Sequence, residues 1–124
     1  MRRPSTRHVL LAQGAYYVAT GVAPFVSRRG FEAVTGPKSD WWLVETVGAL
    51  VTTVGAALVS ATRGDRVTPE IVGTAAGCAA GLAAIDIVYV ARRRIAATYL
   101  IDAALEAAAI AGLVAAGVRP RPPS

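Results

Sequence analysis

The chain has 124 residues, of which 54% are hydrophobic and 17% are charged, and its formal net charge is +5. Few soluble domains are so apolar, and the charges gather in short clusters between four apolar runs, which is the layout of a polytopic membrane protein. The basic residues lie at the ends of these runs, where positive-inside placement and lipid phosphates explain them, so we expect no nucleic-acid partner.

The first predicted span covers residues 9–27 and follows a short basic leader. A basic leader before an apolar run is also the pattern of a signal peptide, but no convincing small-residue cleavage site follows. Pro24 falls in the last turn, where it need not break the span. At helical spacing, the span carries a polar stripe made of Gln13, Tyr16, Tyr17 and Thr20. These tyrosines either line a polar interior or anchor the helix at the membrane surface.

The longest loop covers residues 28–40, and Gly36-Pro37 predicts a turn in it. The residues from Arg28 to Val34 predict a short segment lying in the headgroup region. The second span, about residues 41–61, begins with two tryptophans, whose rings prefer the membrane interface. Glu45 shares one face of this span with Gly48 and Gly55, and small residues on a shared face allow helices to approach closely.

The third predicted span covers about residues 69–91 and begins with a proline, which suits the first turn of a helix. Gly73, Gly77 and Gly81 form a repeated small-xxx-small pattern, which predicts helix packing and, through it, a homo-oligomer. Asp86 follows Gly77 by nine residues, so at about 100° per residue it points away from these glycines. We expect Asp86 and Tyr89 to face another side.

The fourth predicted span, residues 95–118, is long enough to cross the membrane yet contains Asp102 and Glu106. These two acids are four residues apart and therefore share one helical face. An ionised carboxylate in lipid costs at least about 2.5–3.5 kcal/mol, so other helices must shield, hydrate or pair this face. The proline-rich residues 119–124 are predicted to be a disordered tail.

These elements predict an all-α fold, a four-helix transmembrane bundle forming one domain over residues 1–118. Two hairpin repeats are one interpretation of this bundle, since residues 25–29 resemble residues 89–93 and residues 42–45 resemble residues 99–102. If the repeat is real, the hairpins are related by an axis along the membrane normal. Short matches in a biased composition also arise by chance, so both explanations stay open.

Four acids on three predicted spans lie in the same half of the membrane. Counted at 1.5 Å per residue from the side that carries loops 28–40 and 92–94, their depths run from about 7 to about 18 Å. We interpret them as lining a cavity that binds or passes a cationic or protonated small molecule. The predicted ligand-binding residues are Asp86, Asp102, Glu106, Glu45, Tyr99 and Tyr89.

Several other interpretations stay open. The acids could be structural, paired with Arg28, Lys38, Arg92 or Arg93, or bonded to a tyrosine hydroxyl. The protein would then be a structural or accessory membrane subunit without a ligand of its own. An intramembrane isomerase that uses carboxylates as acid and base is a third interpretation.

The sequence favours no enzyme class and assigns no catalytic residue. Its single cysteine and single histidine give no intramolecular disulfide, no Ser-His-Asp set and no metal cluster. We therefore expect neither a metal nor another cofactor. The expected partners are membrane lipid, the cationic ligand or proton, and a second copy of the chain.

The orientation in the membrane is only weakly specified. Seven Arg and Lys residues fall on the side of the termini and six on the other side, so the positive-inside rule does not decide. The basic leader favours cytoplasmic termini and a multi-pass protein of the cell inner membrane. The small bias also permits dual topology and an antiparallel dimer, as in small multidrug transporters. Those proteins, however, keep their key acid in the first span, where this chain has none.

Three segments of the first half, residues 13–17 (Gln-Gly-Ala-Tyr-Tyr), 31–38 and 42–48, carry a resemblance. They resemble small bacterial four-span proteins of the broad DoxX-like kind. The resemblance implies a four-helix bundle and carries over no catalytic residue. The second half departs from it with its additional acids.

Overall fold

The computed structural model describes residues 5–117, and this part of the chain is entirely helical apart from turns. The helices are α1 (Thr6–Val26), α2 (Arg28–Thr35), α3 (Trp41–Arg63), α4 (Pro69–Ala91) and α5 (Tyr99–Gly117). All except α2 are long and apolar enough to cross a membrane. The predicted all-α fold with four membrane-spanning helices is therefore confirmed. The predicted disordered tail lies outside the described residues.

Local capping sets where the helices begin. The Ser5 side chain accepts a hydrogen bond from the His8 backbone N–H, so α1 begins three residues before the predicted span. Ser27 caps α2 in the same way, which makes the segment predicted after the first span a helix of its own. Thr68 caps α4 directly before Pro69, and α4 has the predicted bounds.

The last helix begins at Tyr99, four residues later than expected. Residues 92–98 form a turn instead, in which the Arg94 N–H bonds to the Tyr89 carbonyl at 2.9 Å. Arg93 has a φ of 58°, a left-handed conformation that cannot continue a right-handed helix. The apolar pattern alone does not reveal this turn.

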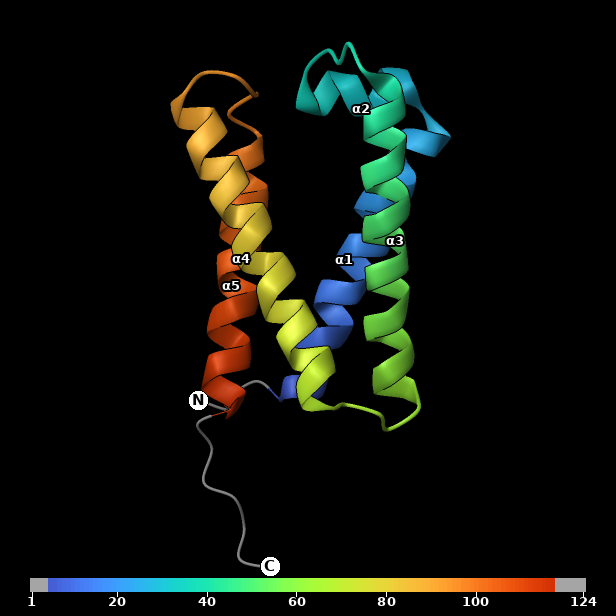
Figure 1. Ribbon diagram of the computed structural model, residues 1–124, viewed down its shortest axis with the longest axis vertical. Coiled ribbons are helices and arrows are strands. Elements are labelled where there is room, and N and C mark those ends of the chain that lie inside the picture. The colour runs from blue at the N-terminus through green and yellow to red at the C-terminus, as the bar shows by residue number, and fades with distance from the viewer. Residues whose placement is uncertain (1–4, 118–124) are drawn as a thin grey trace, which may run out of the picture.

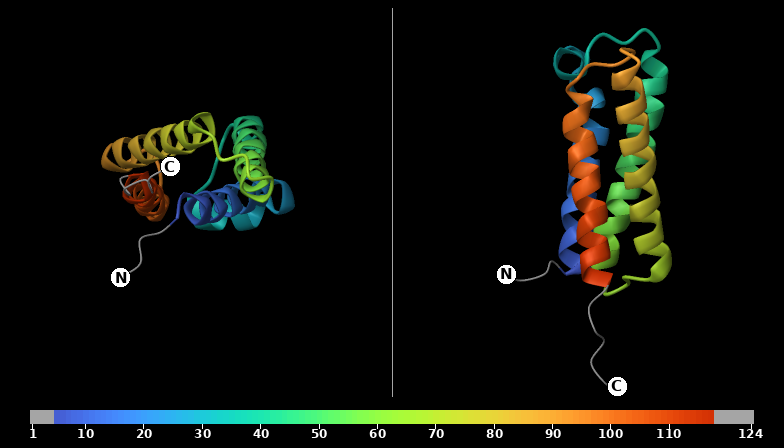
Figure 2. Two further views of the ribbon diagram at one scale, coloured as in Figure 1. Left: turned by 90° about the horizontal axis from the view of Figure 1, so that it is seen from below. Right: turned by 90° about the vertical axis from the view of Figure 1, so that its left-hand side faces the viewer.

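The helices are arranged as two hairpin pairs. Helix α1 packs along α3, and α4 packs along α5, while the two pairs meet mainly through α1 and α5 (Figure 1, Figure 2). Within the first pair, glycines let the backbones approach: a Cβ on Gly14 would lie 2.8 Å from the Gly55 carbonyl oxygen. One on Gly48 would lie 2.6 Å from the Gly21 carbonyl oxygen. The close approach predicted from Gly48 and Gly55 is thus made with α1.

The glycine pattern of α4 has no packing partner within the described chain. A Cβ built on Gly73, Gly77 or Gly81 would meet no atom within 4 Å. Helix α4 turns its opposite side inward, where Ala75, Ala79 and Asp86 are buried. Within residues 5–117 these glycines therefore make no helix contact, and the contact with a second copy of the chain stays a prediction.

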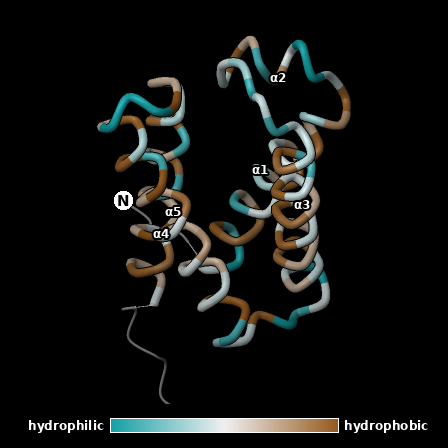
Figure 3. The backbone as a smooth tube through the Cα atoms, turned by 45° about the horizontal axis from the view of Figure 1, so that its top comes forward, coloured by the Kyte–Doolittle hydropathy of each residue, from teal (hydrophilic) through white to brown (hydrophobic). Residues whose placement is uncertain are grey.

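Apolar side chains cover the outside of the helices, and several polar ones are buried inside. Phe25, Leu50 and Val114 are more than half exposed, whereas Gln13 and Glu106 are buried. Figure 3 shows hydropathy along the backbone, with mostly apolar residues in the long helices and hydrophilic residues in the turns and in part of α2. An apolar exterior around buried polar groups suits a lipid environment, and together with the four candidate spans it identifies an integral membrane protein.

The hydrophobic core closes one end of the molecule. Leu10, Leu58, Ala75 and Leu113 pack together near the helix ends that lie opposite α2, and Tyr17, near the middle of α1, is a further member of this cluster. The helix pairs diverge toward the other end, beneath α2 (Figure 1). The core therefore forms the floor of the space in which the acidic residues lie.

Candidate functional site

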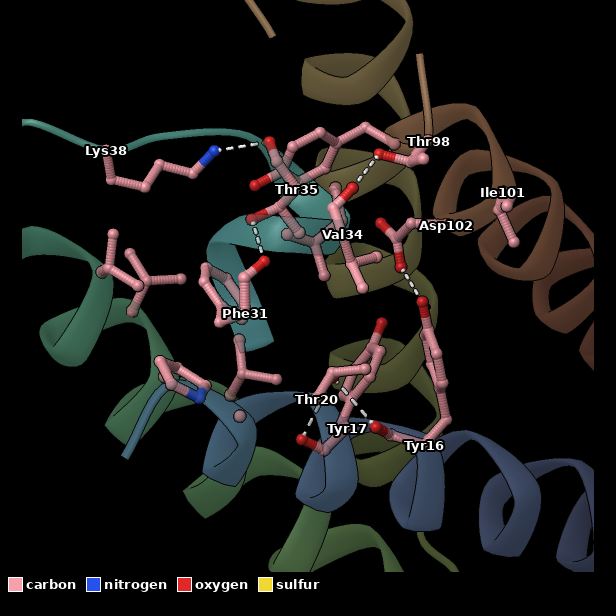
Figure 4. A pocket seen from close by; sticks show the side chains of 18 of the residues that line it. Tyr16, Tyr17, Thr20, Phe31, Val34, Thr35, Lys38, Thr98, Ile101 and Asp102 are labelled. Atoms are coloured by element: carbon pink, nitrogen blue, oxygen red, sulfur yellow. Dashed lines mark hydrogen bonds between the residues drawn. The ribbon is translucent and has the colours of Figure 1, made fainter. Parts of the chain in front are cut away.

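A cavity of about 480 Å³ lies between the helix pairs beneath α2 (Figure 4). Most of its wall is apolar, with α1, α3 and α5 as the sides and Phe31 and Val34 of α2 above. Its polar lining residues are Tyr16, Tyr17, Thr20, Thr35, Lys38, Thr98, Tyr99, Asp102 and Glu106. Three of the residues predicted from sequence, Asp102, Glu106 and Tyr99, thus share this wall.

Tyr16 connects α1 to Asp102 across the cavity. Its hydroxyl donates a hydrogen bond to Asp102 Oδ1 at 2.6 Å, as Figure 4 shows. Asp102 is half-buried and lies on the first turn of α5. A bond to a tyrosine hydroxyl was one of the structural interpretations of this acid, and the structure contains that bond.

A second hydrogen-bond chain runs deeper in the same wall. The Tyr17 hydroxyl donates to Glu106 Oε1 at 2.7 Å and accepts from Gln13 Nε2 at 3.0 Å. The same amide nitrogen donates to the Ala75 carbonyl at 2.9 Å, so the chain joins α1, α4 and α5. Gln13 is 5% exposed, Tyr17 2% and Glu106 1%, so these hydrogen bonds are buried between the helices.

The direction of these bonds leaves acceptors without donors. Each tyrosine hydroxyl donates its single O–H to a carboxyl oxygen, so Asp102 and Glu106 are both hydrogen-bond acceptors. The second oxygen of Glu106 and Oε1 of Gln13 are buried without a hydrogen-bond partner. A buried polar atom without a partner costs about 1–3 kcal/mol, so these positions favour a donor.

Asp86 joins the acids but does not line the cavity. It is 5% exposed on the α5-facing side of α4 and neighbours Asp102, and its Oδ2 also lacks a partner. Its predicted basic partners are elsewhere: the Arg92 guanidinium lies 5.9 Å from the centre of the Tyr89 ring. Among residues 5–117, the salt bridge that forms is Arg28 with Glu32, and none involves Asp86, Asp102 or Glu106.

Two of the predicted ligand-binding residues lie apart from this group. Glu45 is half-buried on α3, and although Val44 and Val47 line the cavity, Glu45 does not. Tyr89 contacts Arg92 near the end of α4 and is likewise outside the lining. Counting residues along the spans placed Glu45 in the same half of the membrane as the other acids, but depth does not specify the direction in which a side chain points.

The residues that sequence reasoning left out of the site are Gln13, Tyr16 and Tyr17. The sequence feature that pointed to them was the polar stripe on the first span. Its tyrosines, however, fitted a role as anchors at the membrane interface equally well. Tyr16 and Tyr17 are neighbours in the chain, and Asp102 and Glu106 are one helical turn apart, so each tyrosine reaches a different acid. Only the crossing of α1 with α5 selects this arrangement.

Helix α2 is held over the cavity by contacts outside the spans. The Thr98 hydroxyl donates to the Val34 carbonyl at 2.7 Å, which joins α2 to the turn before α5. Glu32 accepts from the Lys38 backbone N–H at 2.6 Å and from Arg28 Nε at 2.9 Å. The Lys38 N–H and then the Arg28 guanidinium lower the pKa of the Glu32 carboxyl.

The residues 5–117 bring together no group of three or more His, Cys, Asp or Glu side chains that could hold a metal ion. Asp102 and Glu106 instead each accept a hydrogen bond from a tyrosine of α1 on a mostly apolar wall. In comparisons with known proteins, no family model, no curated protein and no solved structure matches this chain.

Proposed function

We propose that this integral membrane protein binds a small organic cation, such as a protonated amine with an apolar body, in the cavity beneath α2. The observation that carries the proposal is the pair Asp102 and Glu106. Each accepts a tyrosine hydrogen bond on the wall of an apolar cavity, and neither forms a salt bridge within residues 5–117. Passage of such a cation or of a proton across the membrane is the extended form of the same proposal.

Charge and hydrogen bonding specify the ligand. Carboxylates buried in a span are costly unless a cation or a donor accompanies them. An ammonium group supplies a positive charge and N–H donors together, and the buried, unpartnered Oε2 of Glu106 is an acceptor that such a donor would satisfy. The ring of Tyr16 on the same wall adds a face that attracts cations, whereas the Tyr99 ring already lies 5.2 Å from Lys38 Nζ.

Size and polarity specify the rest of the ligand. A volume of about 480 Å³ lies within the range of about 300–1,000 Å³ that is usual for small-molecule sites. The apolar walls supplied by Val47, Val51 and Leu82 favour an aliphatic or aromatic body over a bare inorganic ion. In this proposal Asp86 adds negative charge behind Asp102, whereas Glu45 and Tyr89, which do not line the cavity, do not contact the ligand.

The test is a binding series on the purified full-length protein in detergent. Phenethylamine is compared with phenethyl alcohol and phenylpropionate, which keep a similar body but are neutral or anionic. We expect saturable thermal stabilisation by the amine, equivalent to about 2.7 kcal/mol at 100 times its Kd, and none by the other two.

Variants of the cavity residues test whether the thermal stabilisation by the amine comes from binding in the cavity. Glu106→Gln and Asp102→Asn are expected to weaken amine binding at least about 10-fold, which is a change of about 1.4 kcal/mol. Helical circular dichroism checks that both variants stay folded. Glu45→Gln is the matched control, since it removes one charge outside the lining and should bind normally. Equal stabilisation by amine and alcohol would refute the proposal.

A structural or accessory subunit is the second candidate function, and the open glycine face of α4 favours it. Gly73, Gly77 and Gly81 present a surface that nothing in the described chain covers. In such a subunit, Gly77→Leu would abolish the binding of a partner helix. The same substitution would change no ligand response. The DoxX-like relationship, the inner membrane and cytoplasmic termini remain proposals that accompany either function.

A further inference from the structure

A second hollow of about 770 Å³ opens on the outer surface between α1 and α3. It lies at the end of the molecule opposite α2, where α3 passes into the turn before α4 (Figure 1). Its walls have two different characters. Small apolar side chains line the part along the helices, and Ser60, Arg63 and Arg66 line the part at the helix end.

The apolar part is a furrow produced by the glycine contact of α1 with α3. A Cβ on Gly55 would lie 2.6 Å from the Gly14 carbonyl oxygen, so the two backbones nearly touch beside the furrow. Ala15, Ala19 and Ala56 line it and are exposed, and their short side chains keep it shallow and open. A furrow of this kind on the outside of two spanning helices faces the acyl chains of the membrane.

The basic part is held in place by the chain itself. Arg66 Nη2 donates to Ser60 Oγ at 3.1 Å, and the guanidinium packs over Gly64, where a Cβ would lie 2.6 Å from Nε. This fixes Arg66, a turn residue, beside Arg63 on the last turn of α3. Neither arginine forms a salt bridge with a carboxylate of residues 5–117, so both guanidinium groups keep their charge for another partner.

We propose that this furrow binds an anionic phospholipid, with its phosphate on Arg63 and Arg66 and one acyl chain along the alanines. Arginine binds phosphate oxygens through paired N–H groups, and the charge lies at the end of the span, where headgroups are. Free phosphate would satisfy the arginines but leave the apolar furrow unused. This site would bind an anion, whereas the cavity beneath α2 is proposed to bind a cation. The lipid proposal does not depend on the proposed function.

The test measures lipid binding to the full-length protein in detergent by native mass spectrometry. The probes are phosphatidylglycerol and phosphatidylcholine with identical chains, together with glycerol phosphate and inorganic phosphate. We expect phosphatidylglycerol to bind best. Arg63→Gln with Arg66→Gln should weaken it at least about 10-fold, since each basic residue near a membrane surface contributes about 1 kcal/mol.

The matched control is Arg92→Gln with Arg94→Gln, which removes the same charge from exposed arginines at the opposite end. It should change phosphatidylglycerol binding by less than about 2-fold. Ala56→Leu fills the furrow and keeps both arginines, so it should weaken lipid binding without changing phosphate binding. Equal losses in the two double variants, equal binding of the two lipids, or competition by phosphate alone would each overturn the proposal.

Discussion

At the scale of single residues, two neighbouring tyrosines of α1 hold two acids of α5. Tyr17→Phe keeps the ring and removes the hydroxyl that donates to Glu106 and accepts from Gln13. We expect it to lower the free energy of unfolding in detergent by about 1 kcal/mol, because Glu106 Oε1 loses its donor in a buried place. Tyr16→Phe should cost less, since Asp102 is only half-buried. A larger loss for Tyr16→Phe would contradict this order.

Glu32 gives a pH prediction outside the spans. Its pKa is lowered in the folded protein, so its contribution to holding α2 is present above the ordinary glutamate pKa. That contribution is lost as the pH falls from this value through the lower folded pKa. Hydrogen exchange at the Lys38 amide, corrected for its intrinsic pH dependence, should therefore become less protected over this window. Glu32→Gln should remove the pH dependence, and an unchanged profile in that variant would show that another group titrates.

At the scale of helices, the glycines between α1 and α3 are tightly packed, whereas the glycines of α4 are open. Gly55→Ala places a Cβ 2.6 Å from the Gly14 carbonyl oxygen and 2.8 Å from Tyr17 Cβ, so α1 and α3 must separate. We expect a loss of about 1–3 kcal/mol in the free energy of unfolding, measured by denaturant titration in mixed micelles. Gly77→Ala is the control, because its Cβ meets nothing within 4 Å.

The open face of α4 gives a separate prediction about association. Gly77→Leu should leave the unfolding of the single chain nearly unchanged, since a Cβ at Gly77 meets no atom of residues 5–117 within 4 Å. If copies pack through this face, the bulky side chain should shift the protein from oligomer to monomer, because small residues are what allow close approach in lipid. Cross-linking in membranes or native mass spectrometry measures the change. An oligomer unaffected by Gly77→Leu would assign its interface to another surface.

At the scale of the whole molecule, the four spans place α2 and the α3–α4 turn at opposite ends (Figure 1). In a Cys78→Ala background, Ser39→Cys and Val67→Cys each introduce one exposed thiol, one at each end. We expect a membrane-impermeant thiol reagent to label them from opposite sides of the bilayer. With cytoplasmic termini, position 39 is labelled from outside intact cells. Labelling of both positions from one side in every molecule would exclude a bundle that spans the membrane.

The sequence alone was sufficient for the existence of the four spanning helices and for acids in their interior, but not for the turn that delays the start of α5 to Tyr99. Apolar length predicted the four spans, since a bilayer requires about 20 apolar residues per helix. The spacing of Asp102 and Glu106 predicted that they share a face, and Asp86 was expected to turn away from the glycines of α4. These are properties of one helix, and the geometry of a single helix follows from residue spacing.

Tertiary structure decided which groups meet. It joined Asp102 to Tyr16 and Glu106 to Tyr17, buried Asp86 beside α5, and left Glu45 and Tyr89 outside the cavity lining. It also placed the close glycine contact between α1 and α3, and it left the glycines of α4 without a contact in the described residues. The physical reason is that spacing fixes a direction only relative to its own helix axis. The rotation and crossing of packed helices, which depend on all the side chains between them, decide what lies in that direction.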